Sequence, residues 1–122
     1  MLEREFMNNW VKSALEGNPN RYWLRIPDSA SGIKPFDGVL WLADGRSLAI
    51  EFKVWRSGKK FDYSTVEPHQ MRALLEFQLK GDPMAQRPAR EAKIIVLFER
   101  TGKVKMYPPS QKILDKMLGI VR

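Results

Sequence analysis

Cysteine is absent from the sequence, and histidine occurs only once, as His69. Without cysteine the chain has no disulfide bonds, no zinc knuckles and no thiol nucleophile. A lone histidine also excludes a histidine-rich metal centre. Any metal ion that this chain binds must therefore rest on oxygen ligands, which suit hard divalent cations.

Long apolar runs are also missing. No stretch approaches the roughly 18 consecutive apolar residues that a membrane-spanning helix needs. The chain opens on the charged segment Leu2-Glu3-Arg4-Glu5 rather than on the basic, then apolar, pattern of a secretory signal. We therefore expect a soluble, cytoplasmic protein that makes no membrane contact.

Basic residues outnumber acidic ones. The 21 Lys and Arg against 14 Asp and Glu give a net charge of +7 and a pI near 9.9. This excess favours an anionic partner, with nucleic acid as the first candidate, although a basic surface that only maintains solubility is the alternative. A chain of 122 residues buries about two thirds of its unfolded surface, which predicts one domain over residues 1–122.

Apolar periodicity predicts three helices and five strands. The helices are expected at residues 2–16, from Ser64 or Thr65 to about residue 81, and from Ser110 onward. The strands are expected at residues 22–26, 38–42, 47–54, 93–98 and 103–107. This order predicts an α/β fold with a central mixed β-sheet flanked by helices.

Two carboxylates fall on neighbouring strands of this scheme. Asp37 lies at the start of one strand and Glu51 near the end of the next, and Asp44-Gly45 between them is a hairpin turn signal. The hairpin would bring the two carboxylates together, where they repel unless a cation lies between them. Taken singly, Asp37 could equally be an ordinary turn residue and Glu51 part of a solvated strand face.

Lys53 completes the group, because residues two apart on a strand project from the same face. Glu51 and Lys53 should therefore share a face while Phe52 points into apolar packing. Carboxylates hold a hard divalent ion, the ion polarises a phosphate and activates water, and an ammonium steadies developing negative charge. This combination of residue types suits phosphodiester hydrolysis.

The segments Lys34-Pro35-Phe36-Asp37-Gly38 and Ala49-Ile50-Glu51-Phe52-Lys53-Val54 resemble the core of PD-(D/E)xK nucleases, and the wider pattern is similar to archaeal-type Holliday junction resolvases. The resemblance implies a restriction-endonuclease-like fold. It also implies Mg²⁺, replaceable by Mn²⁺, on Asp37, Glu51 and the Phe52 carbonyl. Pro27-Asp28 holds the literal Pro-Asp pair, so Asp28 is an alternative metal ligand.

The resemblance extends to both sides of this core. Glu3-Arg4-Glu5-Phe6 looks like the family's first-helix motif, which implies that Glu3 joins the metal site and Arg4 faces DNA. His69-Gln70-Met71-Arg72 resembles the start of the helix that packs on the active-site sheet, with Gln70 reaching the site. A helix-stabilising charge is the alternative for Glu3. His69 could be a general base, but at the start of a helix a capping or surface role is more common.

Basic residues near the proposed hairpin are candidate contacts to DNA phosphates. Besides Arg4, the predicted DNA-binding residues are Arg25, Arg56, Lys59, Lys60 and Arg72. Of the four tryptophans, only Trp55 lies beside the active strand, where it could stack on a nucleotide.

These expectations combine into a Mg²⁺-dependent endonuclease that resolves four-way DNA junctions, with Glu3, Asp37, Glu51, Lys53 and Gln70 as catalytic residues. Paired cuts on two strands imply a homodimer. The alternatives are another PD-(D/E)xK nuclease of the restriction or repair type, a non-catalytic DNA-binding protein on the same fold, and a protein-binding adaptor with an incidental basic charge.

Overall fold

The computed structural model describes residues 1–28, 33–79 and 90–120. In these ranges helices and strands follow the predicted order. They are α1 (Glu3–Leu15), β1 (Tyr22–Arg25), β2 (Gly38–Trp41), β3 (Ser47–Trp55), the 3-10 helix η1 (Tyr63–Thr65), α2 (Pro68–Leu79), β4 (Arg90–Phe98), β5 (Lys103–Tyr107) and α3 (Gln111–Met117). Among the described residues, no helix is long and apolar enough to cross a membrane.

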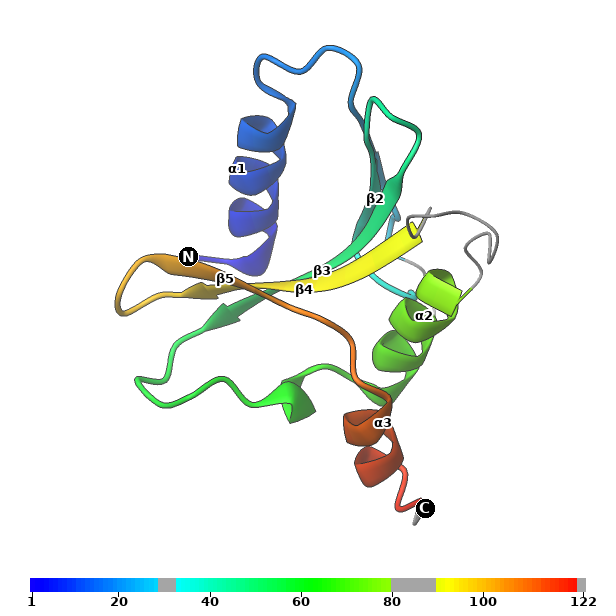
Figure 1. Ribbon diagram of the computed structural model, residues 1–122. Coiled ribbons are helices and arrows are strands. Elements are labelled where there is room, and N and C mark those ends of the chain that lie inside the picture. The colour runs from blue at the N-terminus through cyan, green and yellow to red at the C-terminus, as the bar shows by residue number, and fades with distance from the viewer. Residues whose placement is uncertain (29–32, 80–89, 121–122) are drawn as a thin grey trace.

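The five strands form one mixed sheet in the order β1-β2-β3-β4-β5. The first three strands pair antiparallel, and β4 and β5 form a second antiparallel hairpin. Strands β3 and β4 pair in parallel over nine residues each, and α2 lies in the connection between them (Figure 1). The predicted central mixed β-sheet with flanking helices is confirmed.

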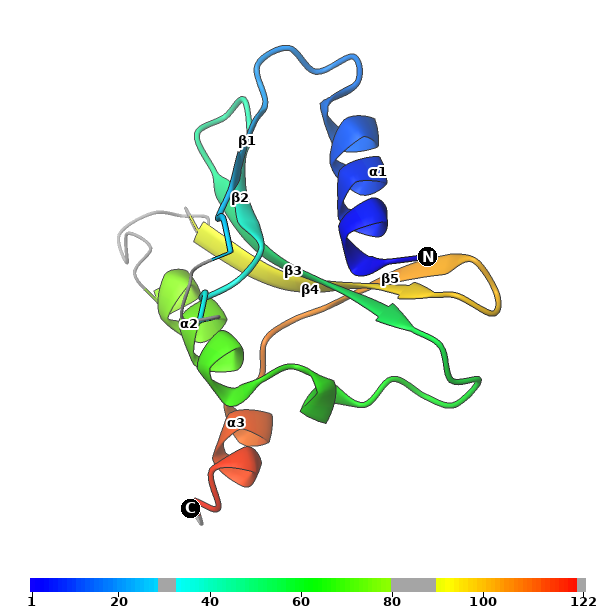
Figure 2. The ribbon, with the colours of Figure 1, turned by 180° about the vertical axis from the view of Figure 1, so that it is seen from behind.

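The helices cover both faces of the sheet (Figures 1 and 2). On one face, Phe6, Met7 and Val11 of α1 pack against Ile50 and Phe52 of β3. Alternate residues of β3 thus meet α1, which explains why Phe52 is fully buried.

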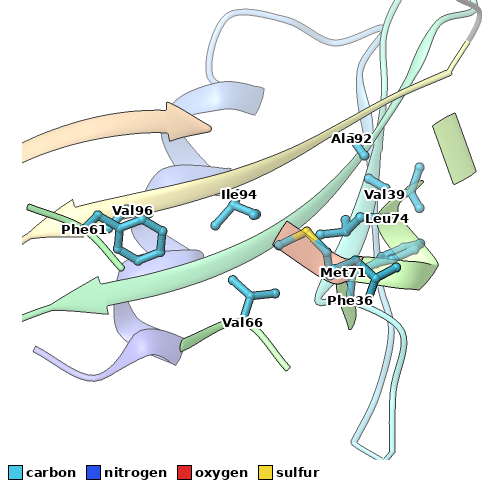
Figure 3. Close-up of a cluster of buried hydrophobic side chains, with 11 residues drawn as sticks. Phe36, Val39, Phe61, Val66, Met71, Leu74, Ala92, Ile94 and Val96 are labelled. Carbon is cyan, nitrogen blue, oxygen red and sulfur yellow. The ribbon is translucent and has the colours of Figure 1, made fainter. Parts of the chain in front are cut away.

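The opposite face packs against α2 and α3. Met71 and Leu74 of α2 and Leu114 of α3 join a core cluster with Ala49 of β3 and Ile94 of β4 (Figure 3). Both faces of β3 and β4 are therefore buried, as expected for a parallel pair at the centre of a sheet.

Two predicted boundaries are wrong. Ser64 and Thr65 do not cap α2 but lie in η1, where the Asp62 carboxylate accepts a hydrogen bond from the Ser64 amide. Strand β4 begins at Arg90, three residues before the predicted start, because residues 90–92 pair with the beginning of β3. The expected end of the second helix near residue 81, and most of the loop expected at residues 27–32, lie outside the described residues.

Candidate active site

The candidate site lies where β3 extends past the first residue of β2. Gly38, the first residue of β2, pairs with Ile50, so Asp37 comes to lie beside Glu51 and Phe52. A cleft of about 250 Å³ opens at this point, between α1, the sheet and the N-terminal end of α2. It is lined by Glu3, Arg4, Met7, Arg25, Asp28, Lys34, Asp37, Glu51, Lys53, Glu67 and Gln70.

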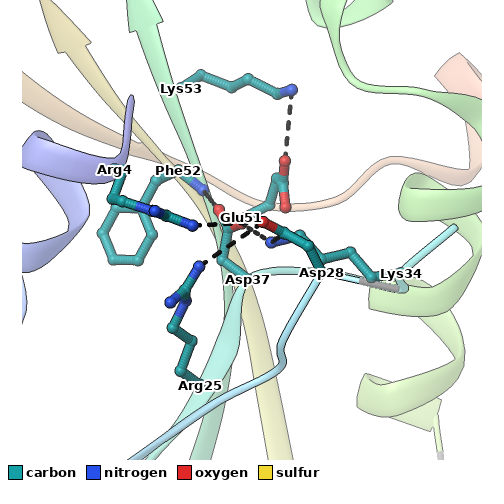
Figure 4. Close-up of polar contacts among 8 residues, drawn as sticks. All are labelled: Arg4, Arg25, Asp28, Lys34, Asp37, Glu51, Phe52 and Lys53. Carbon is teal, nitrogen blue, oxygen red and sulfur yellow. Dashed lines mark hydrogen bonds and ion pairs between the residues drawn. The ribbon is translucent and has the colours of Figure 1, made fainter. Parts of the chain in front are cut away.

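Asp37 is fixed by both its backbone and its carboxylate. Its amide donates to the Ile50 carbonyl at 3.0 Å, and its own carbonyl accepts from the Ile26 amide at 2.9 Å. The carboxylate oxygen Oδ2 accepts from the Phe52 amide at 2.7 Å (Figure 4). The side chain thus supplies the acceptor for a β3 amide that lies beyond the end of β2.

Glu51 and Lys53 share a face of β3, as predicted, and Lys53 Nζ lies 3.3 Å from Glu51 Oε2 (Figure 4). Glu51 is 3% exposed. Its second oxygen, Oε1, is buried and has no hydrogen-bond partner. Burial, then the charge of Asp37 and last that of Glu3 raise the pKa of Glu51 to about 8, although Lys53 lowers it.

Lys34 supplies a second ammonium group on the other side of Asp37. Its Nζ lies 3.1 Å from Asp37 Oδ1 and 2.8 Å from Asp28 Oδ1. Asp28 also faces Arg4 and Arg25, at 3.4 Å and 3.8 Å (Figure 4). Hydrogen bonding and charge from Lys34, ahead of Arg25 and Arg4, lower the pKa of Asp28.

The donor set at the cleft fits a hard divalent cation. The unsatisfied Glu51 Oε1 and the adjoining Asp37 carboxylate are oxygen ligands of the required kind. An extended residue presents its N–H and C=O on the same edge of a strand, so the Phe52 carbonyl faces the edge where Asp37 lies. Within the described residues, no group of three or more acidic or histidine side chains is gathered to hold a metal ion, so Asp37 and Glu51 would hold it together with this carbonyl and water.

The predicted site residues divide into two sets. The first set lines the cleft together with Asp37, Glu51 and Lys53, and consists of Glu3, Arg4, Arg25 and Gln70. Gln70 has a structural role as well, because its Oε1 accepts from the Glu67 amide at 3.4 Å, the hydrogen bond of a capping box at the start of α2. Glu5 is exposed on α1 and is not among the residues that line the cleft.

The other predicted DNA contacts lie outside the cleft. Arg56 follows β3 and binds the Met1 carbonyl at 2.8 Å, with Glu99 at 3.8 Å. Lys59 and Lys60 lie in the next loop, and Arg72 is exposed on α2. None of these four residues lines the cleft that holds Asp37 and Glu51.

Trp55 and His69, which the sequence offered for nucleotide stacking and general-base catalysis, contact other residues of the chain. The Trp55 indole donates to the Lys59 carbonyl at 2.8 Å, and its ring packs edge-on against Phe61. Trp55 is thus a packing residue in this structure. His69 Nδ1 lies 3.2 Å from Glu67 Oε2 at the start of α2, and His69 is not among the residues that line the cleft.

Sequence reasoning missed Lys34 and Glu67 as cleft residues. Lys34 could have been suspected because it lies three residues before Asp37, in the segment that resembles the nuclease core. No local pattern marks Glu67, which reaches the cleft through the packing of α2 on the sheet.

Comparison with known proteins adds no assignment. No protein-family model matches the sequence, and no curated protein matches it.

Proposed function

We propose that this protein is a Mg²⁺-dependent endonuclease of the PD-(D/E)xK class that cuts four-way DNA junctions. The observation that supports the proposal best is the meeting of Asp37, Glu51 and Lys53 at the open edge of β3, with one buried carboxylate oxygen unsatisfied. A fold that buries an unsatisfied carboxylate loses stability, and a divalent cation would remove that cost. The five-stranded sheet with helices on both faces is compatible with a restriction-endonuclease-like fold.

In the proposed mechanism Asp37, Glu51 and the Phe52 carbonyl would hold the cation, helped by Glu3, which lines the same cleft. A bound magnesium ion polarises a phosphate and lowers the pKa of coordinated water. The Lys53 ammonium, held beside Glu51, orients the attacking water and stabilises negative charge on the phosphate as it develops. Arg4 and Arg25 bind the DNA backbone on the other side of Asp37.

The choice of a junction as substrate rests on the resemblance of the Asp37 and Glu51-Phe52-Lys53 segments to junction resolvases. Two symmetric cuts need two active sites, so we expect a homodimer with two-fold symmetry. Such an enzyme would act in the cytoplasm, on branched chromosomal or viral DNA.

The test is cleavage of a labelled synthetic four-way junction, beside linear duplex and single strands, with Mg²⁺ or with a chelator. The wild type should give paired nicks only with Mg²⁺. Lys53→Ala should lower the cleavage rate by about 100-fold or more, the scale of one transition-state electrostatic contact, and should leave junction affinity within about threefold, since only one of several charges is lost. Lys103→Ala removes the same charge from β5, at a residue that does not line the cleft, and should cut normally.

The remaining outcomes separate the alternatives. Cleavage of linear DNA without preference for the junction would indicate a restriction or repair type of nuclease. Salt-dependent binding without cleavage would indicate a non-catalytic DNA-binding protein. No DNA affinity at all would reject both classes and leave the protein-binding adaptor.

A further inference from the structure

Three cations from three parts of the chain converge on the single carboxylate of Asp28. Arg4 comes from α1, Arg25 from the end of β1, and Lys34 from the segment before β2. The Asp28 side chain is 62% exposed, and exposed ion pairs contribute little to folding. Stability alone therefore does not account for this convergence.

The cations around Asp28 outnumber the carboxylates with which they form ion pairs in the described part of the chain. Lys34 is shared with Asp37, while Arg4 and Arg25 have Asp28 as the only carboxylate among their ion pairs in the described part of the chain. The three cations would therefore also accept another anion with the same single charge and the same two free oxygens as the Asp28 carboxylate. A phosphodiester has one negative charge and two free oxygens, and arginine binds such groups through paired hydrogen bonds.

This cluster of cations lies beside the two carboxylates of the candidate site, Asp37 and Glu51. Lys34 Nζ contacts Asp28 Oδ1 and Asp37 Oδ1 at once, so only one ammonium group separates the two carboxylates. An anion in place of the Asp28 carboxylate would lie within the same cleft as Glu51 and Lys53.

We propose that Arg4, Arg25 and Lys34 form a binding site for one backbone phosphate of DNA, and that the Asp28 carboxylate occupies this site in the free protein. Asp28 is then an internal competitor of the substrate and not a metal ligand. DNA binding releases its side chain to solvent, and the three cations transfer to the phosphate. The inference rests on the proposed function, since it names a substrate contact of the same cleft.

The competition can be measured as DNA affinity in chelator, where cleavage cannot take place. Asp28→Asn should bind a labelled four-way junction roughly threefold to tenfold more tightly than the wild type, because the exposed ion pairs no longer have to be broken. Asp44→Asn is the matched control. Asp44 is an exposed aspartate paired with Arg46 at 2.7 Å, it lies outside the cleft, and its substitution changes the net charge equally.

A second pair of variants tests the cations. The side chains of Arg25 and Arg46 are 39% and 38% exposed, and each is paired with a nearby aspartate. Arg25→Ala should weaken binding and reduce the slope of log affinity against log salt by about 0.9, the value for one lost phosphate contact on duplex DNA. Arg46→Ala should leave the slope unchanged. Thermal melting of all four variants checks that each is folded.

The outcomes are separable from those of the nuclease test. Equal affinities of Asp28→Asn and Asp44→Asn, including a lack of binding by both, would overturn the proposed phosphate site. Weaker binding by Asp28→Asn would overturn it too. Tighter binding by Asp28→Asn, together with no cleavage by the wild type in Mg²⁺, would support the phosphate site and reject the nuclease.

Discussion

The ionised Glu51 carboxylate, which the proposed chemistry requires, lowers the stability of the fold because it is buried. Burial and the charge of Asp37 raise its pKa to about 8, from 4.5 for an ordinary glutamate. Between these two pH values the folded state binds more protons than the unfolded state, so the free energy of unfolding falls as pH rises through this window. Below pH 4.5 the carboxyl is protonated in both states and the penalty disappears.

Replacement of Glu51 by glutamine should therefore stabilise the protein in chelator at pH 8. We expect a gain of roughly 1–3 kcal/mol in the free energy of unfolding, the usual cost of a buried unsatisfied polar group, and little gain at pH 4. Thermal melting between pH 4 and 8 measures it, with Glu76→Gln on the exposed side of α2 as the control.

The same melting experiment with added Mg²⁺ tests whether Glu51 binds the cation. Added Mg²⁺ should raise the melting temperature of the wild type at pH 8 and have a smaller effect on Glu51→Gln, because a ligand that binds only the folded state stabilises it. A wild type that is more stable than Glu51→Gln in chelator at pH 8 would contradict the assigned cause of the pKa shift.

At the scale of elements, much of the fold is readable from short-range pattern. The Asp44-Gly45 turn fixes the register of β2 on β3, so the meeting of Asp37 with Glu51 could be predicted. Lys34 could have been suspected from its place three residues before Asp37. Glu67 could not be predicted as a cleft residue, because its position depends on how α2 packs over the sheet. The early start of β4 was missed for the same reason, since residues 90–92 pair with a strand more than 40 positions away in the sequence.

Strand β1 depends on Gly38. A Cβ atom at this position would lie 2.5 Å from Trp23 Cζ2 and 2.6 Å from the Leu24 carbonyl oxygen. Gly38→Ala should therefore push β1 away from β2, with a loss of roughly 1–3 kcal/mol, as for other overpacked sites.

Chemical denaturation measures this loss. Gly58→Ala is the control, because its Cβ would meet only the end of the flexible Arg100 side chain at 3.0 Å, and it should stay within about 0.5 kcal/mol of the wild type. Equal stabilities of the two variants would show that β1 has room to move.

At the scale of the whole molecule, the proposed activity needs more than one chain. The outer strand β1 and its neighbour leave Tyr22, Leu24 and Trp41 exposed, and Tyr22 pairs directly with Trp41 across the strands. Exposed apolar residues that lie together often belong to an interface. A second copy of the chain is the partner that symmetric cutting requires.

Light scattering at micromolar concentration should thus give a mass about twice the 14.2 kDa of one chain. The measurement should be repeated at high salt, because an interface formed by apolar side chains resists salt while contacts between surface charges weaken. A single-chain mass under both conditions would count against paired cutting by this protein alone.

The Asp37 carboxylate accepts the Phe52 amide, and this contact sets limits on how the protein can evolve. Alanine at position 37 would remove the acid and also leave a buried amide without an acceptor. Asparagine would retain an acceptor oxygen in the same place. A lineage that loses the proposed DNA cleavage but keeps this fold should therefore carry asparagine, and not alanine, at position 37.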